Sequence, residues 1–274
     1  MAIRSISFLS PVLSPLLIAV PIAYAQELPF QVISGNRAVI HGTVAGGHEL
    51  AMLVDTGADC SVIDRQAAKR LHLEFLPQTV EYAAYGKVER VPLALVRDLK
   101  VGPISTSLAC IVGDIPTPGV DMILGLNVLS KRNFAIDYEH RTIVFETYAI
   151  PSGSMPFEPH TGLVVIKGQV HDQTIRLLVD TGATTHCVFE EGPVIWHRRN
   201  DGSRAIVSYM GSSSESREVA LKAVSIGAIE WKEVKAMAIA NPKPADWDVV
   251  LGVGSLGLKQ IYFDFEHRLL SWTR

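Results

Sequence analysis

The word Leu-Val-Asp-Thr-Gly-Ala occurs twice in this chain, at residues 53–58 and again at residues 178–183. Each copy closes an apolar run that is typical of a buried β-strand. Because glycine permits a tight turn, Asp55 and Asp180 should each stand at the lip of a turn where a strand ends. Two such turns from related halves can bring two carboxyl groups face to face.

The repetition extends well beyond this word. Matching positions lie 125 to 127 residues apart, and the matching segments are 39–44 with 165–170, 121–125 with 248–252, and 137–141 with 264–268. A period this long indicates one domain that was copied and fused, not a solenoid repeat. We therefore expect a first lobe over 26–150, a linker rich in proline, glycine and serine over 151–159, and a second lobe over 160–274.

Short valine-rich runs between glycine and proline predict a mostly β chain. Short helices are expected only in a few places, chiefly at 65–73 and 127–131. The related words Asp-Tyr-Glu-His-Arg and Asp-Phe-Glu-His-Arg lie between strand-like runs and predict hairpin turns. The predicted fold class is all-β, with two duplicated lobes.

Composition restricts the kind of partner. With 48% hydrophobic and 19% charged residues, the chain has ample material for a globular core. Its formal net charge is -3 and it contains no long basic run, which argues against nucleic acid as a partner.

The first 25 residues predict a signal peptide. Arg4 provides a positive start, an apolar stretch follows, and Ala23-Tyr24-Ala25 fits a small-x-small cleavage site before Gln26. The alternative is an uncleaved membrane anchor, but this segment is interrupted by Pro11, Pro15 and Pro21. We expect a periplasmic or secreted protein with no membrane span after cleavage.

The three cysteines, Cys60, Cys110 and Cys187, have no metal-type spacing. A Cys60–Cys110 disulfide could form in an oxidising compartment, and buried free thiols fit the sequence equally well. His186 beside Cys187 is the one tempting metal or nucleophile pair, and a structural role on a strand is the favoured interpretation. Ser213 and Ser214 lack the Gly-x-Ser-x-Gly context of a serine hydrolase.

The duplicated Asp-Thr-Gly-Ala word, with an apolar-apolar-Gly word ending at Gly125 and at Gly252, resembles the aspartic proteases. It is more similar to the retroviral (retropepsin-like) type than to pepsin. The resemblance covers nearly all of the chain after the signal peptide, and it implies a bilobal acid-protease fold with a central cleft. Retroviral enzymes obtain the second lobe by dimerisation, whereas here both lobes lie in one chain, and the expected state is a monomer.

The resemblance also implies roles for particular residues. Asp55 and Asp180 would be the catalytic pair, and their loops would be supported by Thr56, Gly57, Thr181 and Gly182. Asp59 and Thr184 match positions that hold substrate backbone. Two hairpins would act as flaps over the cleft through Tyr85, Gly86, Met210 and Gly211, and the alternative is that they are ordinary surface hairpins. The chain departs from the retroviral pattern at Leu126 and Val253, where that family usually has arginine.

This pair implies a chemistry that needs no metal or cofactor. Two carboxyl groups about 3 Å apart share one proton, and the aspartic proteases are the established example of such coupling. The ionised member activates a water molecule, and the protonated member gives its proton to the peptide carbonyl oxygen. Ala58 and Ala183 stand where pepsin-like chains have a hydroxyl donor, so we expect a raised first pKa and activity at mildly acidic to near-neutral pH.

The sequence therefore favours an exported aspartic endopeptidase acting on protein or peptide. The alternative function is a catalytically inactive module of the same fold that binds peptide or cell-envelope material.

Overall fold

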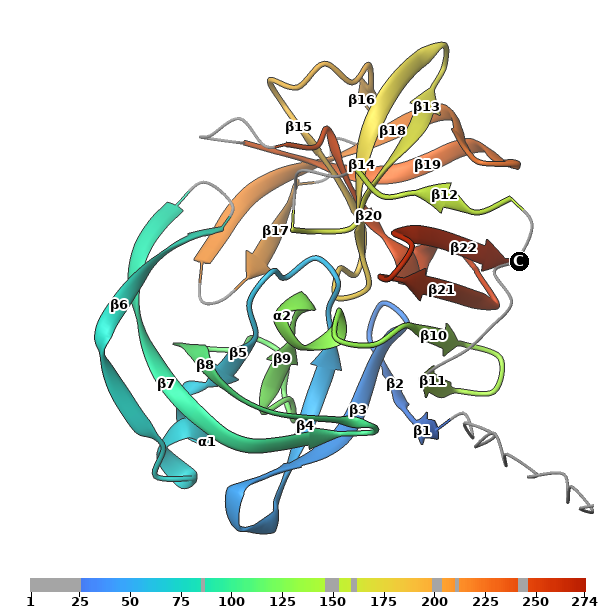
Figure 1. The fold of residues 1–274 in the computed structure, drawn as a ribbon. Helices are drawn as coiled ribbons and strands as arrows, with labels where there is room; N and C mark the ends of the chain where they lie inside the picture. The colour runs from blue at the N-terminus through green and yellow to red at the C-terminus, as the bar shows by residue number, and fades with distance from the viewer. Residues whose placement is uncertain are drawn as a thin grey trace, which may run out of the picture.

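The computed structural model describes residues 26–84, 87–145, 153–158, 162–198, 204–209, 212–240 and 246–274. It consists of two β-sheet lobes, one from each half of the chain, with a third sheet built jointly by both halves (Figure 1). The predicted all-β, bilobal fold is confirmed. Within the described ranges, no helix has the length and apolar character needed to cross a bilayer.

The first lobe is an eight-stranded sheet in the order β2-β3-β4-β9-β5-β8-β7-β6. Its central feature is the parallel pairing of β4 with β9, and contact between β3 and β7 curls the sheet. The strands are β2 (Gln31–Ile33), β3 (Arg37–Val44), β4 (His48–Val54), β5 (Val62–Asp64), β6 (Glu74–Ala84), β7 (Lys87–Val101), β8 (Ile104–Gly113) and β9 (Met122–Leu124).

The second lobe repeats this topology. Its sheet has the order β13-β14-β20-β15-β19-β18-β16, with β17 paired to β18, and β14 pairs in parallel with β20 as β4 does with β9. The duplication seen in the sequence is thus a duplication of strand pairing. The strands are β13 (Val165–Val170), β14 (Gln173–Asp180), β15 (His186–Phe189), β16 (His197–Arg198), β17 (Arg204–Tyr209), β18 (Ser212–Ile226), β19 (Ile229–Ile239) and β20 (Val249–Gly252).

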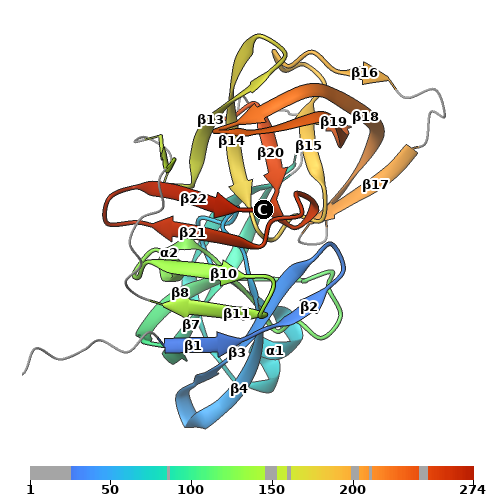
Figure 2. The same ribbon diagram turned by 90° about the vertical axis from the view of Figure 1, so that its right-hand side faces the viewer.

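The third sheet is six-stranded and joins the halves. Its order is β1-β11-β10-β21-β22-β12, so that β10 and β21 meet in the middle as antiparallel neighbours (Figure 2). Both predicted hairpin turns are confirmed, because they connect β10 to β11 and β21 to β22. The strands are β1 (Gln26–Pro29), β10 (Phe134–Asp137), β11 (Thr142–Phe145), β12 (Met155–Pro156), β21 (Gln260–Asp264) and β22 (Leu269–Thr273).

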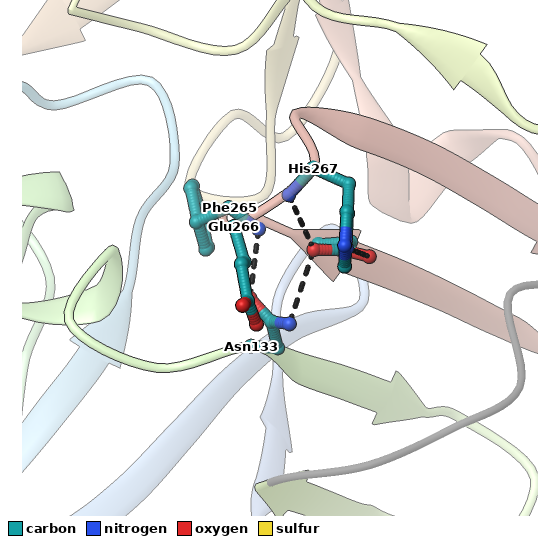
Figure 3. A network of polar contacts seen from close by, with 5 residues as sticks. Asn133, Phe265, Glu266 and His267 are labelled. Atoms are coloured by element: carbon teal, nitrogen blue, oxygen red, sulfur yellow. Dashed lines mark hydrogen bonds and ion pairs between the residues drawn. The ribbon is translucent and has the colours of Figure 1, made fainter.

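Aromatic and polar contacts fasten the halves where this sheet crosses between them. The rings of Phe134 and Phe263 stack at 4.8 Å, and both side chains are fully buried. Asn133 accepts hydrogen bonds from the backbone N–H groups of Phe265 and Glu266 at 2.8 and 3.3 Å, and donates to Asp264 at 3.1 Å (Figure 3). The first half therefore binds the β21–β22 turn of the second half directly.

A matching contact runs in the opposite direction. Gln260, which occupies the position 127 residues after Asn133, donates to Asp137 Oδ2 at 2.5 Å. The junction is thus reciprocal, as expected where two copies of one unit meet about an approximate two-fold axis.

Both predicted helices exist but are shorter than expected. Helix α1 spans Arg65–Arg70, and its start is capped by Asp64, which accepts from the N–H groups of Gln66 and Ala67. It stops before 73 because His72 adopts a φ of 50°, which ends a right-handed helix. Helix α2 is a single turn, Leu126–Leu129, whose counterpart in the second half is the 3-10 turn Val253–Ser255. All three cysteines are free thiols, with Cys60 exposed and Cys110 and Cys187 buried.

Candidate active site

The two Asp-Thr-Gly turns meet between the lobes. Asp55 follows β4 directly and Asp180 is the last residue of β14, so matching strands of the two sheets deliver one carboxyl group each. The two carboxyl groups are hydrogen-bonded to one another. The structure therefore brings together the pair that the sequence singled out.

The glycine of each turn lies against the carboxyl group of the other half. A Cβ atom on Gly57 would lie 2.4 Å from Asp180 Cγ, and one on Gly182 would lie 2.4 Å from Asp55 Cγ. Both distances are far below van der Waals contact, so no larger residue fits at either position without moving a carboxyl group. Glycine is required here by close approach, since neither position has a positive φ.

The threonines of the two turns exchange hydrogen bonds. Thr56 N donates to Thr181 Oγ1 at 3.1 Å, and Thr181 N donates to Thr56 Oγ1 at 3.2 Å. Each hydroxyl then donates across the interface, from Thr56 to Val179 O at 2.7 Å and from Thr181 to Val54 O at 2.8 Å. Both side chains are buried, and the four bonds fix the separation of the two turns.

Backbone N–H groups hold each carboxyl group in place. Gly57 N donates to Asp55 Oδ1 at 2.9 Å, and Gly182 N and Ala183 N both donate to Asp180 Oδ1 at 2.8 Å. Asp55 is only 3% exposed, whereas Asp180 keeps partial exposure. The two acids thus have the same local turn but unequal surroundings.

These surroundings act differently on the pKa values of the two carboxyl groups. Burial raises the pKa of Asp55 well above its usual range, and the nearby charge of Asp180 raises it further. Burial also raises the pKa of Asp180, but the N–H groups of Ala183 and Gly182, the hydrogen bond from Asp55 and the positive charge of Arg37 oppose that rise. These surroundings favour Asp55 as the member that keeps the proton when the pair is singly protonated.

Comparison with protein families agrees with this geometry. Residues 40–128 match a family described as aspartyl protease, and residues 166–257 match one described as gag-polyprotein putative aspartyl protease. Both halves of the chain belong to the retropepsin-like aspartic protease family. No curated protein matches the chain significantly.

Each retropepsin-like half braces its turn in its own way. In the first half, Ser61 Oγ donates to Asn127 Oδ1 at 2.7 Å and accepts from Gly125 N at 3.0 Å. In the second half, His186 occupies the position equivalent to Ser61, and its Nε2 lies 2.9 Å from Ser255 Oγ, which donates to Gly252 O. His186 thus has the structural role on a strand that we expected, with the added function of bracing the second glycine.

The positions where retroviral enzymes have arginine are apolar here and point into the core. Leu126 is 3% exposed and Val253 is 1% exposed. Hydrophobic packing replaces whatever ion pair an arginine would form at these sites.

The expected substrate-contacting residues are only partly described. Asp59 and Thr184 are both exposed beside their respective turns, and Gly35 of the opposite half packs closely against Thr184. The two expected flaps are hairpins, β6–β7 and β17–β18, which lie on the side of the molecule away from the six-stranded sheet (Figure 1). Their tips, Tyr85, Gly86, Met210 and Gly211, lie outside the described residues.

Arg37 is a site residue that the sequence analysis missed. It is half-buried at the start of β3, and the charges of Asp55 and Asp180 both favour its protonated form. Comparison of the halves could have found it, because the equivalent position in the second half, judged from Val39 and Val165, is Leu163. A charged residue in one half and an apolar residue at the equivalent position of the other show that the two halves are not equivalent here.

Proposed function

We propose that this protein is an exported aspartic endopeptidase that hydrolyses peptide bonds with a water molecule activated between Asp55 and Asp180. The observation that carries the proposal is the hydrogen-bonded pair of carboxyl groups, held at the junction of two retropepsin-like lobes by the reciprocal threonine contacts. Pairs of acids with raised pKa values in a shared site are characteristic of catalytic centres.

The unequal surroundings assign the two roles. Asp180, the charged member, acts as general base and takes a proton from the attacking water. Asp55, which is buried and protonated, acts as general acid and gives its proton to the carbonyl oxygen. The resulting gem-diol collapses when Asp180 passes its proton to the leaving nitrogen, the C–N bond breaks, and one hydroxyl of the diol returns a proton to Asp55. Water supplies the hydroxyl and hydrogen that end on the two products, so no co-reactant is required.

Two features support protein or peptide as the substrate. Both family matches describe aspartyl proteases, and the paired hairpins β6–β7 and β17–β18 are suited to cover an extended chain lying between the lobes. Because one chain supplies both acids, we propose that the active species is a monomer. Light scattering on a sizing column should give the mass of a single chain.

Export is supported by the pattern of the first 25 residues, which lie outside the described part of the chain. When the full chain is expressed in a bacterium, the protein recovered from the periplasm or medium should begin at Gln26. Intact mass spectrometry would measure this, and an unprocessed chain retained in the membrane would contradict export.

The catalytic assignment is tested with casein as substrate. The purified protein should cleave casein, and Asp55→Asn and Asp180→Asn should each lower the rate by several orders of magnitude. Asp172→Asn, an exposed change in the β13–β14 turn, is the matched control and should leave the rate unchanged. If the wild type cleaves nothing yet binds peptide, the protein is the inactive binding module; cleavage that persists in both Asn variants would exclude this pair as the catalytic centre.

A further inference from the structure

We propose that Arg37 is a specificity-determining residue that binds a carboxylate of the peptide substrate close to the scissile bond. This inference rests on the proposed endopeptidase function and adds a substrate class to it, namely peptides with an acidic group on one side of the cleavage site.

Arg37 lies at the contact between the first lobe and the second Asp-Thr-Gly turn. The turn before it, residues 34–36, reaches into the second half, where Gly35 packs on Thr184 and its carbonyl oxygen contacts Gly254. Thr184 lies in the loop that begins at Asp180. Arg37 is therefore anchored at the place where the first lobe meets the second catalytic turn.

The side chain of Arg37 uses only part of its hydrogen-bonding capacity within the described ranges. Its Nε donates to Ser34 O at 2.8 Å, and its Nη1 donates to Thr117 Oγ1 at 3.4 Å. A guanidinium has five N–H donors in a fixed planar arrangement. These two are the only hydrogen bonds of its side chain within the described ranges, and no carboxylate there forms an ion pair with it. Three donors remain, and a substrate carboxylate matches their geometry.

The positive charge of Arg37 interacts with the acid pair. Burial lowers its pKa, and the two acids of the pair raise it, so the guanidinium lies within electrostatic reach of the reacting centre. A half-buried cation without a fixed anion is costly unless a ligand supplies one. The acid pair carries one negative charge, which the shared proton and the N–H groups of the two turns already stabilise.

The two halves differ at the position of Arg37. The equivalent position in the second half is Leu163, which packs against the hydrophobic core. One side of the pair therefore offers a cation and the other an apolar side chain. A peptide that lies across both lobes should show the acidic preference on one side of the scissile bond only.

Matched quenched peptides test this directly. Each pair of peptides has blocked ends and differs only in Glu or Gln at one position near the scissile bond. For wild type, the kcat/KM ratio of Glu to Gln should be roughly tenfold to a hundredfold at one position, the range expected for a charge-assisted hydrogen bond to an arginine. In Arg37→Gln the ratio should fall to about one, and Arg37→Lys should retain part of it.

Because the ratio is taken within one protein variant, changes in the catalytic pair cancel. Arg65→Gln, in helix α1, where the side chain pairs with Asp114 at the surface, is the control and should keep the wild-type ratio. A further peptide set, with Gln throughout and either a free or an amidated C-terminus, distinguishes a side-chain carboxylate from a terminal one. A preference for the free terminus that is lost in Arg37→Gln would identify the terminal carboxylate as the group bound.

Failure of this inference can be distinguished from failure of the proposed function. Efficient cleavage without preference for any carboxylate, or a preference that survives in Arg37→Gln, would overturn this inference and leave the endopeptidase intact. If Arg37→Gln does not fold, the ratio measured on the wild type and Arg37→Lys still decides. If no peptide is cleaved at all, the proposed function fails and this inference fails with it.

Discussion

Thr56 and Thr181 each donate a backbone N–H to the hydroxyl of the other, at 3.1 and 3.2 Å, although 125 residues separate them in the chain. Each hydroxyl also donates to a carbonyl oxygen in the opposite half. The geometry of the proposed active site and the cohesion of the two lobes therefore depend on the same buried bonds.

Thr181→Val should destabilise the protein and abolish activity. The change leaves Val54 O and Thr56 N buried without partners, at a cost of roughly 2–5 kcal/mol in free energy of unfolding. Urea unfolding monitored by tryptophan fluorescence measures this. Thr181→Ser keeps the hydroxyl and is the control; if it lost as much stability as Thr181→Val, the hydrogen bonds would not be the cause.

Gly57→Ala should lower kcat/KM by at least about a hundredfold while the fold persists, since the new methyl group would displace Asp180. Gly182→Ala should act in the same way on Asp55. Circular dichroism in the near ultraviolet reports whether packing is retained. As control, Gly192→Ala places a methyl group outside the site, with its nearest atom at 3.2 Å. Wild-type activity in both site variants would show that the carboxyl positions are not critical.

The pH dependence of kcat/KM should have its maximum at mildly acidic to near-neutral pH. The acid limb reports the first ionisation of the pair and the alkaline limb reports the second, and burial raises the pKa values of both carboxyl groups above the usual range. Ala183→Ser adds a hydroxyl that can donate to the charged carboxylate, so the acid limb should move to lower pH. A wild-type maximum below about pH 3, where ordinary carboxylates are protonated, would contradict the prediction.

Stability should fall as pH falls from about 6.5 to about 4, because of His186. Burial lowers the pKa of His186 to about 4, whereas an unfolded histidine has a value of 6.5. Between these values the unfolded chain binds the proton first, so acid favours unfolding, by up to roughly 3 kcal/mol at the lower end.

Chemical denaturation at several pH values, compared with His186→Gln, measures this contribution. The variant keeps an N–H donor for Ser255 but cannot titrate, so its stability should depend less on pH across this window. Equal pH dependence in the two proteins would exclude His186 as the cause. His140 contributes with the opposite sign, because Asp137 raises its pKa, and it is unchanged in both proteins.

The paired Asp-Thr-Gly turns and the two-lobed fold could be predicted because the chain contains the same chemically specific sequence twice. Asp55 and Asp180 are recognisable from the sequence, since an aspartate after an apolar strand and before glycine has few structural explanations. The prediction of two short helices was also correct in position. Their ends were wrong by up to three residues, because helix propensity does not predict the positive φ of His72 that follows the first helix.

The six-stranded sheet could not be predicted in detail. Two of its strands, Gln26–Pro29 and Met155–Pro156, are too short to show alternation, and each is stabilised by a neighbour distant in sequence. Met155 and Pro156 were expected to be part of a linker. The place of Arg37 beside the acid pair and the contact of His186 with Ser255 could not be predicted for a related reason. Each depends on burial and on groups from another element, which no local sequence pattern records.

The register of β10 against β21 pairs Phe134 with Phe263 and Asp137 with Gln260, so each half presents the same strand to the other. In an assembly of two identical chains, any substitution must occur on both sides of the symmetry axis at once. Covalent fusion removes that constraint. The arginine at 37 opposite leucine at 163, and the serine at 61 opposite histidine at 186, are differences that only a gene encoding both halves can inherit separately.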